Sequence, residues 1–114
     1  VVRTVTDSEI LEAKAQVGAG GFGCEPASAA AVAGARKLRN DGTIAAGDRV
    51  VCVLTGHQLK DPDTTVAYHS SSNDAVDESL AGRGIESILA ANSPETVGNQ
   101  LEEILKSVRR HPAG

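Results

Sequence analysis

The chain has 114 residues and a formal net charge of −4, which allows one small domain and excludes a multidomain assembly. Hydrophobic residues make up 40% and charged residues 23%, as in globular proteins, so disorder of the whole chain is excluded. The acidic balance and the lack of a basic cluster larger than Arg109-Arg110 predict no nucleic-acid partner.

The first predicted helix covers Asp7 to Val17. Thr6-Asp7-Ser8-Glu9 has the pattern of a capping box, in which the Thr6 hydroxyl accepts the Glu9 amide and the Glu9 carboxylate accepts the Thr6 amide. The glycines of Gly18 to Gly21 suit a helix end. Residues 18–23 also match G-x-G-x-x-G, but they follow a helix instead of a strand, so they predict a helix stop and not a dinucleotide site.

The next elements predict a helix-crossover unit of an α/β domain. A short extended stretch, Phe22 to Glu25, precedes a helix over Ala27 to Arg39, which Pro26 starts. Val50 to Leu54 is apolar without alternation, as in strands buried on both faces of a parallel sheet. We therefore predict an α/β fold with a helix–strand–helix–strand order, which the family resemblance below makes an incomplete portion of a larger fold.

The remaining chain gives less specific patterns. Residues 57–74 are polar and turn-rich, and residues 84–89 suit a final short strand. Ser93-Pro94-Glu95 predicts the start of a last helix that continues to about Arg110. One stripe of this helix is apolar, at Val97, Leu101, Ile104, Leu105 and Val108.

Several functional classes are disfavoured. The two cysteines, Cys24 and Cys52, lack the spacing of a disulfide scaffold or a metal pair and are predicted to be buried thiols. The three histidines have no histidine or cysteine at metal-ligand spacing, so we expect no metal site. Without an apolar run of roughly 20 residues or a signal pattern, we expect a cytoplasmic protein with no membrane partner.

The segment from Leu54 to Pro62 carries the most chemistry. A buried strand that ends at Thr55-Gly56 would bring a hydroxyl and a glycine to the edge of the sheet where ligands of open α/β folds lie. The glycine would let a planar ring approach the backbone. These residues therefore fit the edge of a cofactor site, and a strand-terminal threonine in a turn is the alternative.

Two strings in this order resemble threonine synthases: Cys24-Glu-Pro-Ala-Ser-Ala-Ala30 and Val53-Leu-Thr-Gly-His-Gln-Leu-Lys-Asp-Pro62. That family comprises pyridoxal-phosphate enzymes of fold type II, the tryptophan-synthase-β-like fold, and the similarity is to its C-terminal part. It covers about Thr4 to Thr64. Gln58 departs from the family, which usually has glycine there, so its side chain would lean over the cofactor rim or point to solvent.

The resemblance implies a lyase of threonine biosynthesis that converts O-phospho-L-homoserine and water to L-threonine and phosphate. The cofactor implied is pyridoxal 5′-phosphate. By the same resemblance, Thr55 binds the pyridine nitrogen, Gly56 lies beside the ring, and Glu25 lies near that nitrogen. For Glu25 the alternative is capping the helix that starts at Pro26.

The resemblance also implies what the chain lacks. In this family the Schiff-base lysine, the loop for the substrate carboxylate and the phosphate cup lie upstream, and no segment here matches them. Three lysines fall on predicted helices, and Lys60 belongs to another motif. We therefore expect no catalytic residue in this chain, no activity from it alone, and weak binding of the cofactor.

These observations predict a C-terminal piece of a threonine synthase. The chain opens with Val1 instead of methionine, and with one Phe, one Tyr and no Trp its core should be thin. Residues 1–64 would form the C-terminal segment of the large cofactor-binding domain, 65–92 a loop-rich connection, and 93–111 a C-terminal helix. A piece without its sheet neighbours would tend to self-associate.

Two alternatives remain open. One is a non-catalytic, stand-alone α/β interaction module derived from this family, with the last helix as its partner surface. The other is a serine or threonine dehydratase of the same superfamily, against which the string from Thr55 to Pro62 argues.

Overall fold

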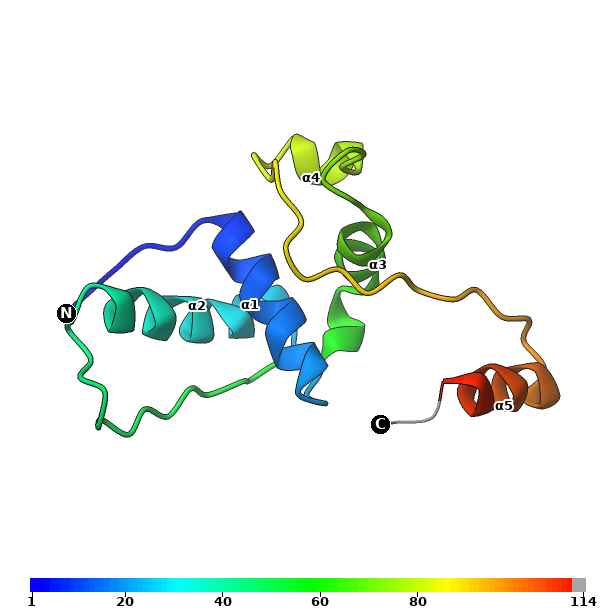
Figure 1. The fold of residues 1–114 in the computed structure, drawn as a ribbon, viewed down its shortest axis with the longest axis horizontal. Helices are drawn as coiled ribbons and strands as arrows, with labels where there is room; N and C mark the ends of the chain where they lie inside the picture. The colour runs from blue at the N-terminus through cyan, green and yellow to red at the C-terminus, as the bar shows by residue number, and fades with distance from the viewer. Residues whose placement is uncertain (112–114) are drawn as a thin grey trace.

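The computed structural model describes residues 1–111, and their regular elements are helices (Figure 1). No β-strand forms within that range, where the β-pairing consists of two isolated antiparallel bridges, Cys24 with His57 and Ser72 with Ala75. The helices are α1 (Asp7–Ala19), α2 (Pro26–Asn40), the 3₁₀ turn η1 (Gln58–Lys60), α3 (Pro62–Ser70), α4 (Glu78–Ala81) and α5 (Leu101–Arg110).

The start and the end of α1 confirm the predicted helix. The Thr6 amide donates to the Glu9 carboxylate at 2.7 Å, and the Glu9 amide donates to the Thr6 hydroxyl at 3.2 Å. The bond from the Thr6 amide is the main reason why the pKa of Glu9 is lowered. Gly20 caps the helix and Gly21 follows with a φ of 86°, so the glycine-rich stretch is a helix stop.

Helix α2 also forms as predicted and crosses α1 (Figure 1). The two helices approach closely because the buried residues between them are small: Ala13, Cys24, Ala29 and Ala33. At the margin of this contact, Arg36 pairs with Glu12 at 2.8 Å. Cys24 is buried as predicted, whereas Cys52 is only half-buried.

A second small core joins α1 to the later helices. It contains Leu11, Ala15, Tyr68, Leu80, Ile85 and Ile88. The predicted short strand over residues 84–89 is wrong, because the Ile88 amide bonds the Asn73 side chain at 2.7 Å instead of a neighbouring strand. That segment still contributes Ile85 and Ile88 to the core, and the prediction of a thin core is confirmed.

The two strands predicted around α2 are absent from the described residues. The segment from Phe22 to Glu25 forms one isolated bridge, and Val50 to Leu54 runs without regular structure. Val51 is 88% exposed and Val53 67% exposed. A strand needs hydrogen-bonding neighbours on both edges to be buried in a sheet, and residues 1–111 offer none here.

The last helix starts later than predicted. It begins at Leu101 instead of near Ser93, since Glu95 lies beside the helix and bonds Arg110 at 2.6 Å. Gly98 and Asn99 have low helix propensity and interrupt a continuous helix from residue 93. In Figure 1, α5 lies at the end of a long connection, away from α1 and α2.

The chain has a larger accessible surface and a larger radius of gyration than a compact domain of its mass. Its accessible surface is 7935 Å², against about 5,900 Å² for a compact monomer of 11.7 kDa. Its radius of gyration is 15.9 Å, against about 13 Å for a compact domain of this length. Apolar surface on the segment before Thr55 and on α5 therefore lacks cover within residues 1–111.

Within the described range, no helix combines the length and the apolar character required to cross a bilayer.

Candidate functional site

The two strings singled out in the sequence meet in space. Cys24 and His57 form an antiparallel bridge, and the Glu25 amide donates to the Gly56 carbonyl at 3.0 Å. This contact brings the start of α2 against the Thr55-Gly56 turn. The backbone therefore brings the two strings together, although the predicted parallel strands do not form in the described residues.

Ser28 links the two strings through its side chain. It is buried in the first turn of α2, and its hydroxyl accepts the Gly56 amide at 2.9 Å. The same oxygen lies 3.3 Å from the Thr55 hydroxyl oxygen. Thr55 is an exposed residue whose hydroxyl is oriented by the contact with Ser28.

Ser28 is not among the site residues that the sequence predicted, although it stands in the first of the two strings. Its position could have indicated this role. Ser28 lies three residues after Glu25, in the first turn of a helix, where serine hydroxyls often hydrogen-bond backbone groups. Its contact with Gly56 depends on a residue far along the chain, which local patterns do not report.

Glu25 covers Gly56. A Cβ atom added at Gly56 would overlap the Glu25 carboxylate, so the glycine allows the two residues to approach closely. The Lys60 ammonium lies 3.5 Å from the Glu25 carboxylate. Glu25 is the N-cap residue of α2, but its side chain makes no capping hydrogen bond, so the alternative role as a side-chain cap is wrong.

The rest of the second string builds a local turn. His57 accepts the Leu59 amide through Nδ1 at 3.2 Å, and Asp61 accepts the Thr64 amide at 3.1 Å. These bonds start η1 and α3 respectively. The Gln58 side chain lies against Gly23, where an added Cβ would overlap it, so Gln58 closes the site on the side of the α1–α2 connection.

Two lysines are engaged away from Thr55 and Gly56 in the described chain. Lys14 is buried and donates to the Thr65 hydroxyl at 2.8 Å, and burial lowers its pKa. Lys37 pairs with Glu9 at 3.2 Å. Among residues 1–111, no lysine hydrogen bond or ion pair involves Thr55 or Gly56, whereas Lys60 pairs with Glu25, which covers Gly56.

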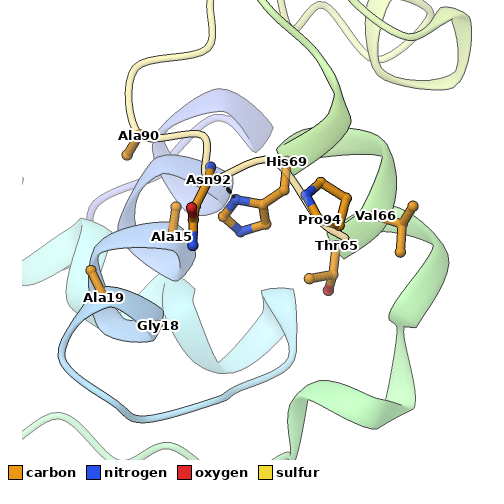
Figure 2. Close-up of a pocket in the computed structure, with 9 residues that line it drawn as sticks. All are labelled: Ala15, Gly18, Ala19, Thr65, Val66, His69, Ala90, Asn92 and Pro94. Carbon is orange, nitrogen blue, oxygen red and sulfur yellow. Dashed lines mark hydrogen bonds between the residues drawn. The ribbon is translucent and has the colours of Figure 1, made fainter. Parts of the chain in front are cut away.

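A separate cavity of about 280 Å³ lies between α1, α3 and the segment around Asn92 (Figure 2). Its walls are mostly small and apolar. His69 Nδ1 accepts the Asn92 amide at 3.0 Å, and burial lowers the pKa of His69. The lining is Ala15, Gly18, Ala19, Thr65, Val66, His69, Ala90, Asn92 and Pro94, so neither Thr55 nor Gly56 contributes to this cavity.

The histidines do not assemble a metal site in the part of the chain that the structure describes. No group of three or more His, Cys, Asp or Glu side chains is placed there to hold a metal ion. His57 and His69 instead accept backbone amides.

The first half of the chain matches a known protein family. Residues 1–56 match the family model described as pyridoxal-phosphate dependent enzyme. The threonine synthase of Methanosarcina acetivorans is 44% identical over 87 residues, which are 70% of this chain and 22% of that protein. The threonine synthase of Synechocystis is 57% identical over 63 residues, which are 54% of this chain and 16% of that protein.

The threonine synthase of Methanocaldococcus jannaschii is 49% identical over 63 residues. The match covers 54% of this chain and 16% of that protein. The chain thus spans about a fifth of the length of the curated relatives it matches.

Proposed function

We propose that this chain is a C-terminal portion of a threonine synthase, because residues 1–56 match the family model of pyridoxal-phosphate dependent enzymes and the similar proteins are threonine synthases. The whole enzyme would convert O-phospho-L-homoserine and water to L-threonine and phosphate. The observation that carries the proposal is the meeting of Ser28, Thr55 and Gly56, which joins the two strings typical of this family into one polar site.

Thr55 fits the pyridine nitrogen of pyridoxal phosphate. Its hydroxyl is neutral and is held by Ser28 at 3.3 Å. When Ser28 donates to Thr55, the Thr55 proton is free for an unprotonated ring nitrogen; when Thr55 donates to Ser28, its oxygen accepts from a protonated nitrogen. A hydroxyl can therefore hydrogen-bond the ring nitrogen in either protonation state, whereas a carboxylate would keep the nitrogen protonated.

The pyridoxal phosphate, when bound, supplies the electron sink for the substrate carbons. The chain's own residues position the ring. Gly56, which has no Cβ, would let a planar ring approach the backbone, and the Glu25 side chain, which now covers Gly56, would turn aside to admit it. Lys60 offsets the Glu25 charge and so limits its field at the ring nitrogen.

We expect no catalytic residue in this chain. The lysine that holds the cofactor and the groups that bind the substrate phosphate and carboxylate would come from the rest of the enzyme. Cofactor binding to this chain alone would then be weak, because Thr55 supplies a single neutral hydrogen bond. The exposed apolar segment before Thr55 favours this proposal over a stand-alone module, since it leaves Val51 and Val53 without cover.

A chimera tests the proposal. In the threonine synthase of Synechocystis, the 63 matched residues are replaced by the corresponding residues of this chain. The chimera should release phosphate from O-phospho-L-homoserine and support growth of a threonine auxotroph. A soluble chimera that binds pyridoxal phosphate but forms no threonine, beside an active parent, would overturn the proposal.

A further inference from the structure

The last helix presents an apolar face without cover in the described chain. None of the residues of α5 is buried. Leu101 is 71% and Val108 62% exposed, and Ile104 and Leu105, on the same stripe between them, are 40% and 39% exposed. An exposed stripe of this kind on a soluble helix marks an interaction surface.

The charges of α5 are arranged by position along the helix. Glu102 and Glu103 lie in the first turn, and Arg109 and Arg110 lie in the last. Glu103 bonds the Gly98 amide and Arg110 bonds Glu95. Within residues 1–111, neither Glu102 nor Arg109 takes part in an ion pair.

Glu102 and Arg109 share one flank of the apolar stripe. At about 100° per residue, side chains seven positions apart differ by only about 20° around the helix. Both therefore border the stripe on the same side, with the negative charge at one end and the positive charge at the other. This arrangement is complementary to its own reversed copy.

We propose that α5 pairs in an antiparallel manner with α5 of a second copy of this chain. A two-fold axis between Ile104 and Leu105 sets Leu101 opposite Val108 of the second copy. In an antiparallel pair, each flank of the apolar stripe faces the same flank of the second copy. Glu102 therefore lies beside Arg109 of the second copy, and the same ion pair occurs twice by symmetry.

The charges select this direction. In a parallel pair, the flank with Glu102 and Arg109 would face the opposite flank, where Ser107 lies, and neither charge would gain a partner. Because α5 spans only about 15 Å, the contact is small and the association is weak and reversible. The inference does not depend on the proposed enzymatic function.

Sedimentation equilibrium of the 114-residue chain tests the pairing. The wild-type chain should show a concentration-dependent monomer–dimer equilibrium. Glu102→Arg and Arg109→Glu should each weaken dimerisation about tenfold or more, because each creates two like-charge contacts. Lys106→Glu is the matched control: it changes the charge of the same helix by the same amount but lies away from the stripe, so it should leave the equilibrium unchanged.

Mixing the two single variants gives the sharpest result. Each variant alone should stay largely monomeric, whereas an equimolar mixture should form heterodimers, because both ion pairs return with their signs exchanged. Circular dichroism confirms that each variant keeps its helix content. A monomeric wild-type chain at all concentrations would overturn the inference; so would a mixture that associates no better than its components.

Discussion

The hydroxyl oxygens of Ser28 and Thr55 lie 3.3 Å apart across a sequence separation of 27 residues. Ser28 also accepts the Gly56 amide at 2.9 Å. One buried side chain thus orients the Thr55 hydroxyl and fixes the turn that follows it. This relationship explains why a serine in the first turn of α2 matters to a candidate cofactor contact that lies on a different segment.

Thr55→Ala should weaken the binding of pyridoxal phosphate to the Synechocystis chimera about tenfold, because a neutral hydrogen bond contributes about 1 to 1.5 kcal/mol. Thr55→Ser should restore binding, since it keeps the hydroxyl. Titration of the cofactor by its absorbance measures the affinity, and an unchanged affinity of Thr55→Ala would contradict the assignment.

Ser28→Ala should lower the free energy of unfolding of the chain by about 1 to 3 kcal/mol, because it leaves the Gly56 amide without its buried acceptor. In the chimera it should also weaken cofactor binding, since Thr55 loses its orienting partner. Urea denaturation gives the first effect. A loss of stability with unchanged cofactor affinity would restrict Ser28 to a structural role.

Gly56→Ala should destabilise the chain by up to about 1 kcal/mol, because the flexible Glu25 side chain has to turn away from the added Cβ and leave its ion pair with Lys60. The same substitution in a Glu25→Ala background should cost less, because the overlapping carboxylate is gone. A double-mutant cycle by urea denaturation measures the coupling. Gly34→Ala is the control: an added Cβ there meets nothing within 4 Å, so it should be neutral or stabilising. Additive costs at Gly56 and Glu25 would disprove the contact.

Lys14→Met should raise the free energy of unfolding at neutral pH by about 1 kcal/mol, because it removes a buried charge whose partner is the neutral Thr65 hydroxyl. Burial lowers the pKa of Lys14 below its ordinary value, although Cys24 and Asp61 act in the opposite direction. The folded chain therefore loses the lysine proton first, and the penalty fades as the pH rises toward the ordinary lysine pKa.

Urea denaturation between pH 7 and 10 measures the difference in the free energy of unfolding between Lys14→Met and the wild-type chain. The advantage of the variant should shrink as the pH rises. A difference that stays constant over this range would show that Lys14 is uncharged or hydrated in the folded chain.

Acidification should destabilise the chain through His69. Burial holds the pKa of His69 below its ordinary value, so its neutral form is favoured in the folded state. Stability from this group is complete above the ordinary histidine pKa and falls as the pH drops from there through the folded pKa. Protonation would also remove the acceptor of the Asn92 amide.

His69→Gln should flatten this part of the stability profile, whereas the exposed His111→Gln should leave it unchanged. Thermal unfolding between about pH 7 and 5 compares the three chains, since the ordinary histidine pKa is about 6.5. Equal pH dependence of wild type and His69→Gln would remove His69 as the cause.

Local patterns predicted the helices whose ends depend on nearby residues. The Thr6–Glu9 capping box and the glycines after α1 act within a few residues, so the sequence contained all the partners. Pro26 and the alanine-rich run likewise predicted α2. The start of α5 was wrong by several residues, because Glu95 bonds the far end of that helix instead of opening it.

By itself, the sequence determined α1, α2 and the two strings that resemble the family, and it identified Thr55 and Gly56 as candidate cofactor-binding residues. Only the tertiary structure decided that Ser28 joins them, that Glu25 covers Gly56 instead of capping α2, and that Val50 to Leu54 lacks strand neighbours in the described chain. The reason is physical: a capped helix satisfies its hydrogen bonds within a few residues, whereas a buried strand and a polar cluster need partners from distant segments.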